Sequence, residues 1–339
     1  MKVIVDDKVP YIKEILPMLG VEAIYVPGDK ITKELVHDAD ALIVRTRTKC
    51  NEELLKGSKV KFIATATIGF DHIDVTYCKQ NGILWTNAAG CNSGAVEQYV
   101  HSSLLLLQRD KGLVLNNSTI GIIGVGHVGS RVCKIATQLG MNTLLYDLPR
   151  MDSGEEGFVD LSTIFEQADV ITFHTPLIKE GRYSTYHMAD ADFFSSLKRK
   201  PFIINTSRGE VIETSSLIDA LSKSMVSDVI LDVWENEPNI DINLLNKAYI
   251  STPHIAGYSA EGKINATRSS LLSLCNFFKM NEIINLSLPP SPFTKGFDYY
   301  NKDYNYLEVY NPIEDSNLLK ARPENFENIR SNYNFRREL

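Results

Sequence analysis

The first third of the chain alternates short apolar runs with stretches of helical periodicity, and Gly, Asp or Asn marks most of the changes. This pattern predicts strands at 2–5, 23–26, 41–45 and 61–65, and helices at 11–19, 32–37 and 52–55. Strands that alternate with helices in this way are typical of parallel sheets with crossover helices. We therefore expect an α/β unit at the start of the chain.

The alternation resumes after a long segment at 95–109, which is apolar on nearly every side and is predicted to form a buried helix. Strand-like runs follow at 119–124, 143–146, 170–174, 202–205, 229–233 and 249–251, with helix-like stretches at 161–167, 190–197 and 215–221. The chain is thus predicted to contain two doubly wound, Rossmann-like parallel sheets in the α/β class.

A further helical pattern at 260–280 is long enough to return to the first unit. We therefore expect a discontinuous substrate domain of residues 1–98 and 258–285, into which a nucleotide-binding domain of residues 99–257 is inserted. From about residue 288 the composition shifts to Pro, Asn, Asp and Tyr. A disordered tail is one explanation of residues 286–339. A small subdomain or a segment that docks on a partner subunit is another, which the aromatic residues favour at least as well.

The composition excludes several classes of protein. With 44% hydrophobic and 23% charged residues, the chain is typical of a packed, enzyme-sized protein. The net charge is −7, and acidic and basic residues alternate along the chain without a basic stripe. This argues against a nucleic-acid partner. Five cysteines without a Cys-x-x-Cys pair, and no long apolar run, favour a cytoplasmic protein without a membrane span. No histidine spacing typical of a metal site occurs, so no metal is expected.

A glycine motif follows a predicted strand and precedes a predicted helix, in the order Gly124, Val125, Gly126, His127, Val128, Gly129. Such a motif lets backbone N–H groups approach a pyrophosphate at the start of a helix. Asp147 ends the next strand, where a carboxylate can accept both ribose hydroxyls of NAD and would repel the 2′-phosphate of NADP. The sequence therefore predicts an NAD site, with a glycine-rich turn that binds no ligand as the alternative.

Three polar residues follow later strands and together supply the groups that oxidation of an alcohol requires. His254 can act as the base, Glu237 can orient it, and Arg208 can bind a carboxylate or a developing oxygen charge. Singly, each has a plainer explanation: a surface ion pair for Arg208, a residue at a helix end for Glu237, and a core position for His254. Their common place after strands favours a catalytic set.

The other histidines are less informative. His174 ends a strand and could line the cofactor site beside Thr175, although no carboxylate is evident as its partner. The remaining ones are predicted to be surface or packing residues: His37, His72, His101 and His187.

Four motifs in this order resemble the D-isomer-specific 2-hydroxyacid dehydrogenase family: the glycine motif, Asn205 to Gly209, Leu231 to Pro238, and Pro253 to Gly257. The resemblance extends over about residues 40–280. It implies NAD-dependent oxidation of a 2-hydroxy acid, with Arg208, Glu237 and His254 as the catalytic residues. It further implies these cofactor contacts: Thr175, Thr206, Ser207, Asp232 and Gly257.

Within the family, the segments at 64–69, 90–92 and 254–258 are most similar to a member that acts on a small phosphorylated 2-hydroxy acid. This resemblance implies substrate contacts at Thr46, Thr67 and Tyr258. Arg45 and Arg47 suit a phosphate by charge and geometry, with a solvent-facing Arg47 equally open.

Residues 326–338 resemble part of a C-terminal dimerisation domain, which implies a homodimer, although the end of the chain at Leu339 predicts a shortened segment. Two other functions remain open. One is a related dehydrogenase that acts on 3-phosphoglycerate or glycerate. The other is a binding protein that senses NADH without turnover.

Overall fold

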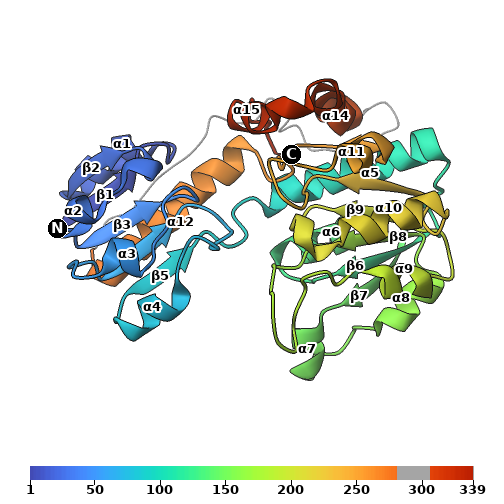
Figure 1. The fold of residues 1–339 in the computed structure, drawn as a ribbon, viewed down its shortest axis with the longest axis horizontal. Helices are drawn as coiled ribbons and strands as arrows, with labels where there is room; N and C mark the ends of the chain where they lie inside the picture. The colour runs from blue at the N-terminus through green and yellow to red at the C-terminus, as the bar shows by residue number, and fades with distance from the viewer. Residues whose placement is uncertain (281–305, 339) are drawn as a thin grey trace. The chain divides into compact units, whose positions relative to one another are not determined.

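The computed structural model describes residues 1–280 and 306–338, and the chain divides into two compact units (Figure 1). Unit 1 consists of Met1–Asn92 and Ser259–Pro292. Unit 2 consists of Ser93–Tyr258 and Phe293–Leu339. The chain therefore leaves the first unit, builds the second and returns, and the described C-terminal residues group with unit 2.

Unit 1 contains a five-stranded parallel sheet in the order β2-β1-β3-β4-β5. Its inner strands consist mostly of apolar residues, and almost all of their residues are buried, as expected when helices cover both faces of a parallel sheet. The edge strand β2 is only half-buried. The bounds are β1 Lys2–Asp6, β2 Glu22–Val26, β3 Ala41–Val44, β4 Phe62–Thr65 and β5 Leu84–Asn87.

The helices of unit 1 are mostly short, and polar side chains cap several of them. Asn51 and Asp74 accept backbone N–H groups at the starts of α3 and α4, and Ser259 does so for α12. The bounds are α1 Ile12–Ile15, η1 Leu16–Leu19, η2 Gly28–Lys30, α2 Lys33–Val36, α3 Glu52–Leu55, α4 Val75–Gln80 and α12 Ala260–Phe278. The single helix predicted at 11–19 is wrong, because Pro17 has no N–H and the chain continues as a 3-10 turn.

Unit 2 contains a six-stranded parallel sheet in the order β11-β10-β9-β8-β6-β7. The strands are β6 Thr119–Ile123, β7 Asn142–Tyr146, β8 Val170–Phe173, β9 Phe202–Asn205, β10 Asp228–Leu231 and β11 Ile250–Ser251. The registers align the last residues of neighbouring strands. The residues that follow them therefore share one edge of the sheet: Gly124, Asp147, His174, Thr206, Asp232 and Thr252.

Helices surround this second sheet, and the long α5 confirms the buried helix predicted at 95–109. The bounds are α5 Ser93–Lys111, α6 His127–Gln138, α7 Leu148–Asp152, α8 Leu161–Gln167, α9 Ala191–Ser196, η3 Gly209–Val211, α10 Thr214–Ser222, α11 Ile242–Lys247, α13 Tyr306–Val309, α14 Pro312–Ala321, η4 Pro323–Asn325 and α15 Phe326–Ser331. Leu319 and Phe326 are buried in the hydrophobic core of unit 2. The described part of the tail is thus folded, and the two-sheet α/β prediction is confirmed.

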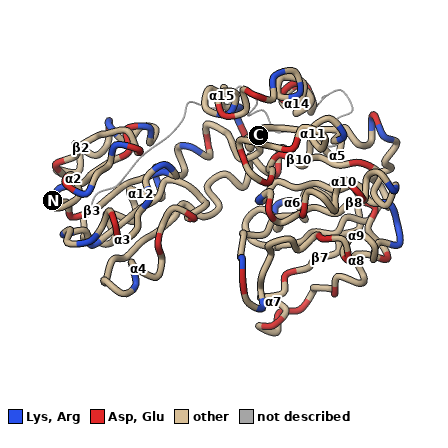
Figure 2. Tube along the Cα trace, in the orientation of Figure 1, with Lys and Arg blue, Asp and Glu red and all other residues tan. Residues whose placement is uncertain are grey.

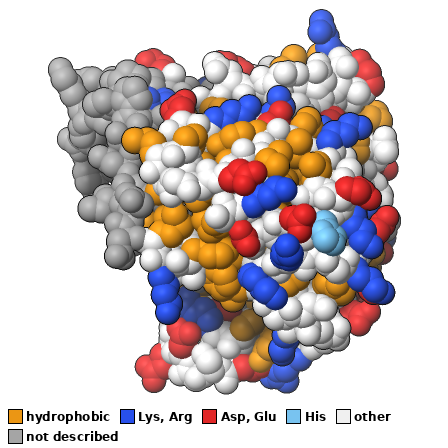
Figure 3. All heavy atoms as spheres, turned by 90° about the vertical axis from the view of Figure 1, so that its left-hand side faces the viewer, with side chains coloured by type: hydrophobic (Ala, Val, Ile, Leu, Met, Phe, Trp, Pro, Cys, Tyr) orange, Lys and Arg blue, Asp and Glu red, His pale blue; other side chains and the backbone are white. Residues whose placement is uncertain are grey.

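Charges of both signs are scattered along the helices and loops of each unit (Figure 2). The visible face in Figure 3 also carries a band of apolar side chains, with lysines and arginines around it. Exposed apolar residues of unit 1 include Met18 and Leu84. Within the described ranges, we find no helix with the length and apolar character to cross a bilayer.

Candidate active site

The three motif glycines have three different surroundings. Gly124 has a φ of +88°, and a Cβ there would lie 2.8 Å from the carbonyl carbon of His174. A Cβ on Gly129 would overlap the carbonyl oxygen of Gly124, so this glycine lets α6 begin directly against the turn. A Cβ on Gly126 would meet nothing within 4 Å. The turn therefore leaves space at its middle glycine, at the end of β6, which has β7 on one side and β8 on the other.

Asp147 is joined to this turn. One oxygen of its carboxylate accepts the backbone N–H of Val125 at 2.9 Å, and the other accepts the N–H of Arg150 at 3.3 Å. The Arg150 guanidinium donates in turn to the carbonyl of Val125 at 2.8 Å. The carboxylate thus lies beside the glycine turn, where it could accept hydrogen bonds from the ribose hydroxyls of a dinucleotide.

The residues after β8 and β9 line the same edge. The ring nitrogens of His174 lie 3.0 Å from the Thr172 hydroxyl and 3.2 Å from the Thr206 hydroxyl. Burial lowers the pKa of His174 to about 3, so the ring is neutral. It connects Thr172 of β8 with Thr206, which follows β9. The buried Thr175 hydroxyl has no hydrogen-bond partner among the described residues.

An unsatisfied buried hydroxyl beside an open glycine turn is what a polar ligand would complete. Gly126, Asp147 and Thr175 together fit NAD: backbone N–H groups for the pyrophosphate, a carboxylate for the ribose, and a hydroxyl in need of a partner.

Asn205 shapes the turn that carries Arg208. Its side-chain oxygen accepts both the N–H of Ser207, at 3.0 Å, and the Ser207 hydroxyl, at 2.8 Å. Its amide nitrogen donates to the carbonyl of Arg208 at 2.9 Å. The half-buried Arg208 is therefore held by its backbone, and its guanidinium donates to the Ser207 carbonyl at 2.8 Å.

The turns after β9 and β10 touch at Gly209. A Cβ at this position would overlap the backbone carbonyl of Trp234, so only glycine allows the approach. The N–H of Trp234 donates to Glu237 Oε1 at 3.0 Å. The close approach of Gly209 to Trp234 therefore brings the turn that holds Arg208 against the turn that holds Glu237.

His254 and Glu237 form the central pair. His254 Nδ1 lies 2.8 Å from Glu237 Oε2, and the side chains are 27% and 18% exposed. Burial acts to raise the pKa of Glu237, but the charge and hydrogen bond of His254, the charge of Arg330 and the Trp234 N–H lower it below its usual value. An ionised Glu237 accepts a hydrogen bond from Nδ1–H, which leaves Nε2 to accept a proton.

Asp232 builds the loop that carries His254. Its backbone carbonyl accepts the N–H of His254 at 2.7 Å, and its buried carboxylate accepts from the Thr252 hydroxyl and the N–H groups of Ile255 and Ala256 at 2.6 to 2.9 Å. Burial raises its pKa, and these donors together with the charge of His254 oppose that rise. The family resemblance implies a cofactor contact for Asp232, and the structure shows that its carboxylate also supports the His254 loop.

The polar scaffold was largely missed in the sequence. Tyr99 donates to the Thr252 hydroxyl at 2.8 Å, and the indole N–H of Trp234 donates to the Thr252 carbonyl at 3.0 Å. A buried threonine after a short strand carries no sequence signal of such a role. Asn205 belongs to a sequence motif, but the motif does not indicate its hydrogen bonds to Ser207 and Arg208.

The candidate substrate contacts are divided between the two units. Arg45, Thr46, Arg47 and Thr67 belong to unit 1, and Tyr258 belongs to unit 2. Arg45 is half-buried and donates to the carbonyl of Lys8 at 3.3 Å, whereas Thr46 and Arg47 are exposed.

Thr67 is fixed within its own loop. Its hydroxyl donates to the Gly69 carbonyl at 2.8 Å and lies 2.7 Å from the Thr65 hydroxyl. Thr65 in turn lies 2.9 Å from His72 Nε2, and burial lowers the pKa of His72. All four unit 1 contacts follow the carboxyl ends of β3 and β4, at one edge of that sheet.

Two other histidines have packing partners. His187 Nε2 lies 2.7 Å from a carboxylate oxygen of Glu235, and the ring of His101 lies 3.8 Å from that of Tyr306. Among the residues that the structure covers, no group of three or more His, Cys, Asp or Glu side chains could hold a metal ion.

The sequence model described as the D-isomer specific 2-hydroxyacid dehydrogenase NAD binding domain matches residues 93–256. The whole chain is 57% identical to the erythronate-4-phosphate dehydrogenase of Bacteroides thetaiotaomicron and covers 97% of it. The chain belongs to the D-isomer specific 2-hydroxyacid dehydrogenase family. The family's Proteus mirabilis erythronate-4-phosphate dehydrogenase is 45% identical over 86% of this chain and 78% of its own length.

Two solved structures of dehydrogenases match most of the chain. The NAD⁺-bound 3-phosphoglycerate dehydrogenase of Entamoeba histolytica matches with a TM-score of 0.69 and 30% identity, over 85% of this chain and 99% of its own. The Aquifex aeolicus D-lactate dehydrogenase, solved with NAD and lactic acid, has a TM-score of 0.68 at 28% identity, over 82% and 96% of the two chains. The chain is an NAD-dependent oxidoreductase.

Proposed function

We propose that the protein oxidises 4-phospho-D-erythronate to (R)-3-hydroxy-2-oxo-4-phosphooxybutanoate, a step of pyridoxal 5′-phosphate (vitamin B6) biosynthesis. The observation that carries the proposal is the His254–Glu237 pair, at 2.8 Å, beside the turn of Arg208. It occurs in a chain that matches curated erythronate-4-phosphate dehydrogenases over its full length.

The roles follow from proton and hydride balance. Gly126, Asp147 and Thr175 would hold NAD, which would supply the acceptor for the hydride that leaves C2. Nε2 of His254 accepts the proton of the C2 hydroxyl, while Glu237 stabilises the imidazolium that forms. The carbon loses a hydride and the oxygen loses a proton, so the products are the 2-oxo acid, NADH and protonated His254.

Arg208 supplies the positive charge. A guanidinium can bind the substrate carboxylate with two hydrogen bonds and can attract the C2 oxygen as charge develops there. The Asn205 hydrogen bonds fix the backbone of its turn, so little ordering remains to be done when substrate binds.

The phosphate requires a further cationic or hydroxyl-rich site. We assign it to Arg45 and Arg47, with Thr46, Thr67 and Tyr258 as further substrate contacts. Support comes from the common location of the first four after strands of one sheet. Thr175, Thr206, Ser207, Asp232 and Gly257 are assigned to the cofactor side, together with the glycine turn and Asp147.

A second candidate is 3-phosphoglycerate, because a structural neighbour at 30% identity is a 3-phosphoglycerate dehydrogenase. D-glycerate is the matching acid without phosphate. A protein that only senses NADH is the remaining alternative, and the paired His254 and Glu237 argue against it because sensing requires no proton acceptor.

We further propose a cytoplasmic homodimer. Support comes from the resemblance of residues 326–338 to the family's C-terminal dimerisation region. Light scattering tests the dimer: we expect a particle of twice the 38.1 kDa chain mass, and a particle of the single chain mass would contradict it.

The substrate is tested by NADH absorbance when the purified protein is mixed with NAD and 4-phospho-D-erythronate, with a trap for the 2-oxo acid. Parallel reactions contain 3-phosphoglycerate or D-glycerate. We expect kcat/KM to be highest for phosphoerythronate. Faster turnover of 3-phosphoglycerate would overturn the substrate, and silence with all three while NAD still binds would favour the sensor.

A further inference from the structure

The last described residues of the chain carry a buried arginine that binds the loop of His254. Arg336 donates from Nη1 to the carbonyls of Ile255 and Tyr258, both at 3.1 Å. Its Nη2 donates to the carbonyl of Ala256 and, at 2.9 Å, to that of Ala95. Three of these four carbonyls belong to the turn that directly follows His254.

The turn is therefore held from two sides. The N–H groups of Ile255 and Ala256 point to the carboxylate of Asp232, and their carbonyl groups point to the guanidinium of Arg336. Asp232 directly follows the strand β10, whereas Arg336 comes from the C-terminal segment, residues 306–338. The carboxylate of Asp232 accepts from the backbone N–H groups of the turn, and the guanidinium of Arg336 donates to its carbonyl groups.

Arg336 is itself firmly placed. Its Nε donates to Gln98 Oε1 at 3.1 Å, and its guanidinium lies 4.1 Å from the centre of the Tyr310 ring. Its Nη1 also lies 3.3 Å from the Tyr333 hydroxyl. A lysine could not reproduce this set, because it lacks the planar fork of donors and the flat face for stacking.

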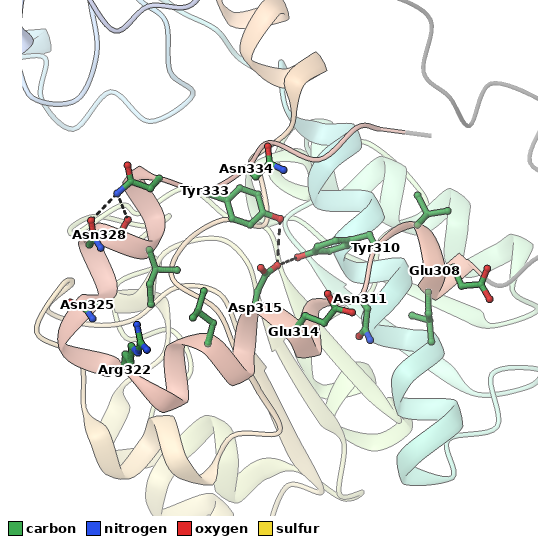
Figure 4. A pocket seen from close by; sticks show the side chains of 15 residues that line it. Glu308, Tyr310, Asn311, Glu314, Asp315, Arg322, Asn325, Asn328, Tyr333 and Asn334 are labelled. Atoms are coloured by element: carbon green, nitrogen blue, oxygen red, sulfur yellow. Dashed lines mark hydrogen bonds between the residues drawn. The ribbon is translucent and has the colours of Figure 1, made fainter.

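The two tyrosines share a third partner. Figure 4 shows the hydroxyls of Tyr310 and Tyr333 pointing to Asp315, in the wall of a cavity of about 540 Å³. The distances to Asp315 Oδ2 are 3.1 and 3.4 Å. Asp315, on α14, thus anchors the tyrosines that surround Arg336.

The same segment provides a second cation. Arg330 Nε donates to the Tyr258 hydroxyl at 3.2 Å, and the charge of Arg330 is among the causes that lower the pKa of Glu237. The C-terminal segment therefore contacts Ile255, Ala256 and Tyr258, and its Arg330 acts electrostatically on Glu237.

We infer that Arg336 is a positioning residue of the oxidation, which holds the 255–258 turn so that His254 stays in hydrogen-bond contact with Glu237. The inference rests on the proposed function for its kinetic consequence. It assigns the C-terminal segment a part in catalysis, in addition to any part in dimerisation.

The test compares Arg336→Lys with Arg322→Lys. Arg322 lies in the same segment but is exposed and makes none of these contacts. For Arg336→Lys we expect kcat to fall about 10- to 100-fold, because a displaced base loses its alignment. The Kd for NADH should rise by no more than about threefold, because Gly257 is the one assigned cofactor contact within the 255–258 turn. Arg322→Lys should match the wild type in both.

A double-mutant cycle separates positioning from a general loss of structure. In a His254→Gln background, Arg336→Lys should lower the residual rate by less than about twofold, because the group that it positions is already absent. An effect as large as in the wild-type background would show that Arg336 acts independently of His254 and would overturn the inference.

A readout without substrate keeps the inference independent of the proposed function. Proton NMR should show a downfield His254 Nδ1–H resonance, assigned by its loss in His254→Gln, that broadens or moves in Arg336→Lys and not in Arg322→Lys. An unchanged resonance in Arg336→Lys overturns the inference. An inactive wild type that shows the expected NMR change overturns the proposed function alone.

Discussion

At the scale of single residues, two carboxylates serve His254 in different ways. Asp232 is buried, which raises its pKa, and its carboxylate accepts hydrogen bonds from Thr252, Ile255 and Ala256 in the loop that it supports. Glu237 is also largely shielded, yet the positive charge of His254 and its other donors lower its pKa. One carboxylate fixes the backbone around His254, and the other fixes the orientation of its ring.

Asp147→Asn should relax cofactor choice. The amide keeps an oxygen that can accept the Val125 N–H, so the glycine turn stays intact, but the negative charge that repels a 2′-phosphate is lost. We expect the preference for NAD over NADP, measured as a ratio of Kd values by fluorescence titration, to fall about tenfold. Asp152→Asn, a nearby acid paired with Arg182, is the control. An unchanged ratio in Asp147→Asn would remove Asp147 from the cofactor site.

At the scale of elements, the ends of parallel strands decide where the chemistry lies. The registers of β6 with β8, β8 with β9 and β9 with β10 place the glycine turn and the turns of Arg208 and Glu237 along one edge. Gly209 then allows two of these turns to meet. The strands supply the alignment, and the turns supply the contacts.

The motif glycines can be separated by alanine substitution. Gly126→Ala places its methyl group in open space, so its thermal midpoint should stay near that of the wild type while NAD affinity falls at least about tenfold. Gly129→Ala forces a methyl group against the Gly124 carbonyl and should lose about 1–3 kcal/mol of stability. Thermal unfolding and NADH titration check both. Equal stability losses would contradict the distinct surroundings of the two glycines.

Most of the strands and the functional edge of the second sheet could be predicted from the sequence. Strands such as β9, at Phe202–Asn205, are continuous apolar runs that end at polar residues, and this pattern locates both the sheet and its functional edge. β5 and α4 were not predicted, because β5 is a half-exposed edge strand without a clear apolar pattern. The contacts of Arg336 with the His254 loop join residues far apart in the chain, and no periodicity records such pairings.

At the scale of the whole molecule, the C-terminal segment links stability to the site. Asp315 is packed against Tyr310 and Tyr333, and Arg336 lies behind the tyrosines. Burial raises the pKa of Asp315 to about 6, although these hydrogen bonds and the charge of Arg336 oppose the rise. In the unfolded chain, the pKa of Asp315 has its ordinary value of about 4. At a pH between these two pKa values, Asp315 is therefore protonated in the folded protein and ionised in the unfolded chain.

The sign of the pH dependence follows. Because the folded pKa is higher than the unfolded one, the Asp315 carboxyl favours folding less as the pH rises from about 4 to about 6. Asp315→Asn lacks this effect. Between about pH 5 and about pH 7.5, the wild type should lose about 1 kcal/mol of unfolding free energy relative to the variant, measured in urea. A difference that does not change with pH would refute the placement of Asp315.

The central claim is that the protein removes a hydride from C2 of phosphoerythronate and passes the hydroxyl proton to His254. The most direct measurement supplies NAD and 4-phospho-D-erythronate deuterated at C2, and follows the label by mass spectrometry. We expect the reduced cofactor to carry the deuterium, and His254→Gln to lower the rate by about 100-fold or more without moving the label. Reduced cofactor without deuterium, or a His254→Gln rate near that of the wild type, would contradict the account.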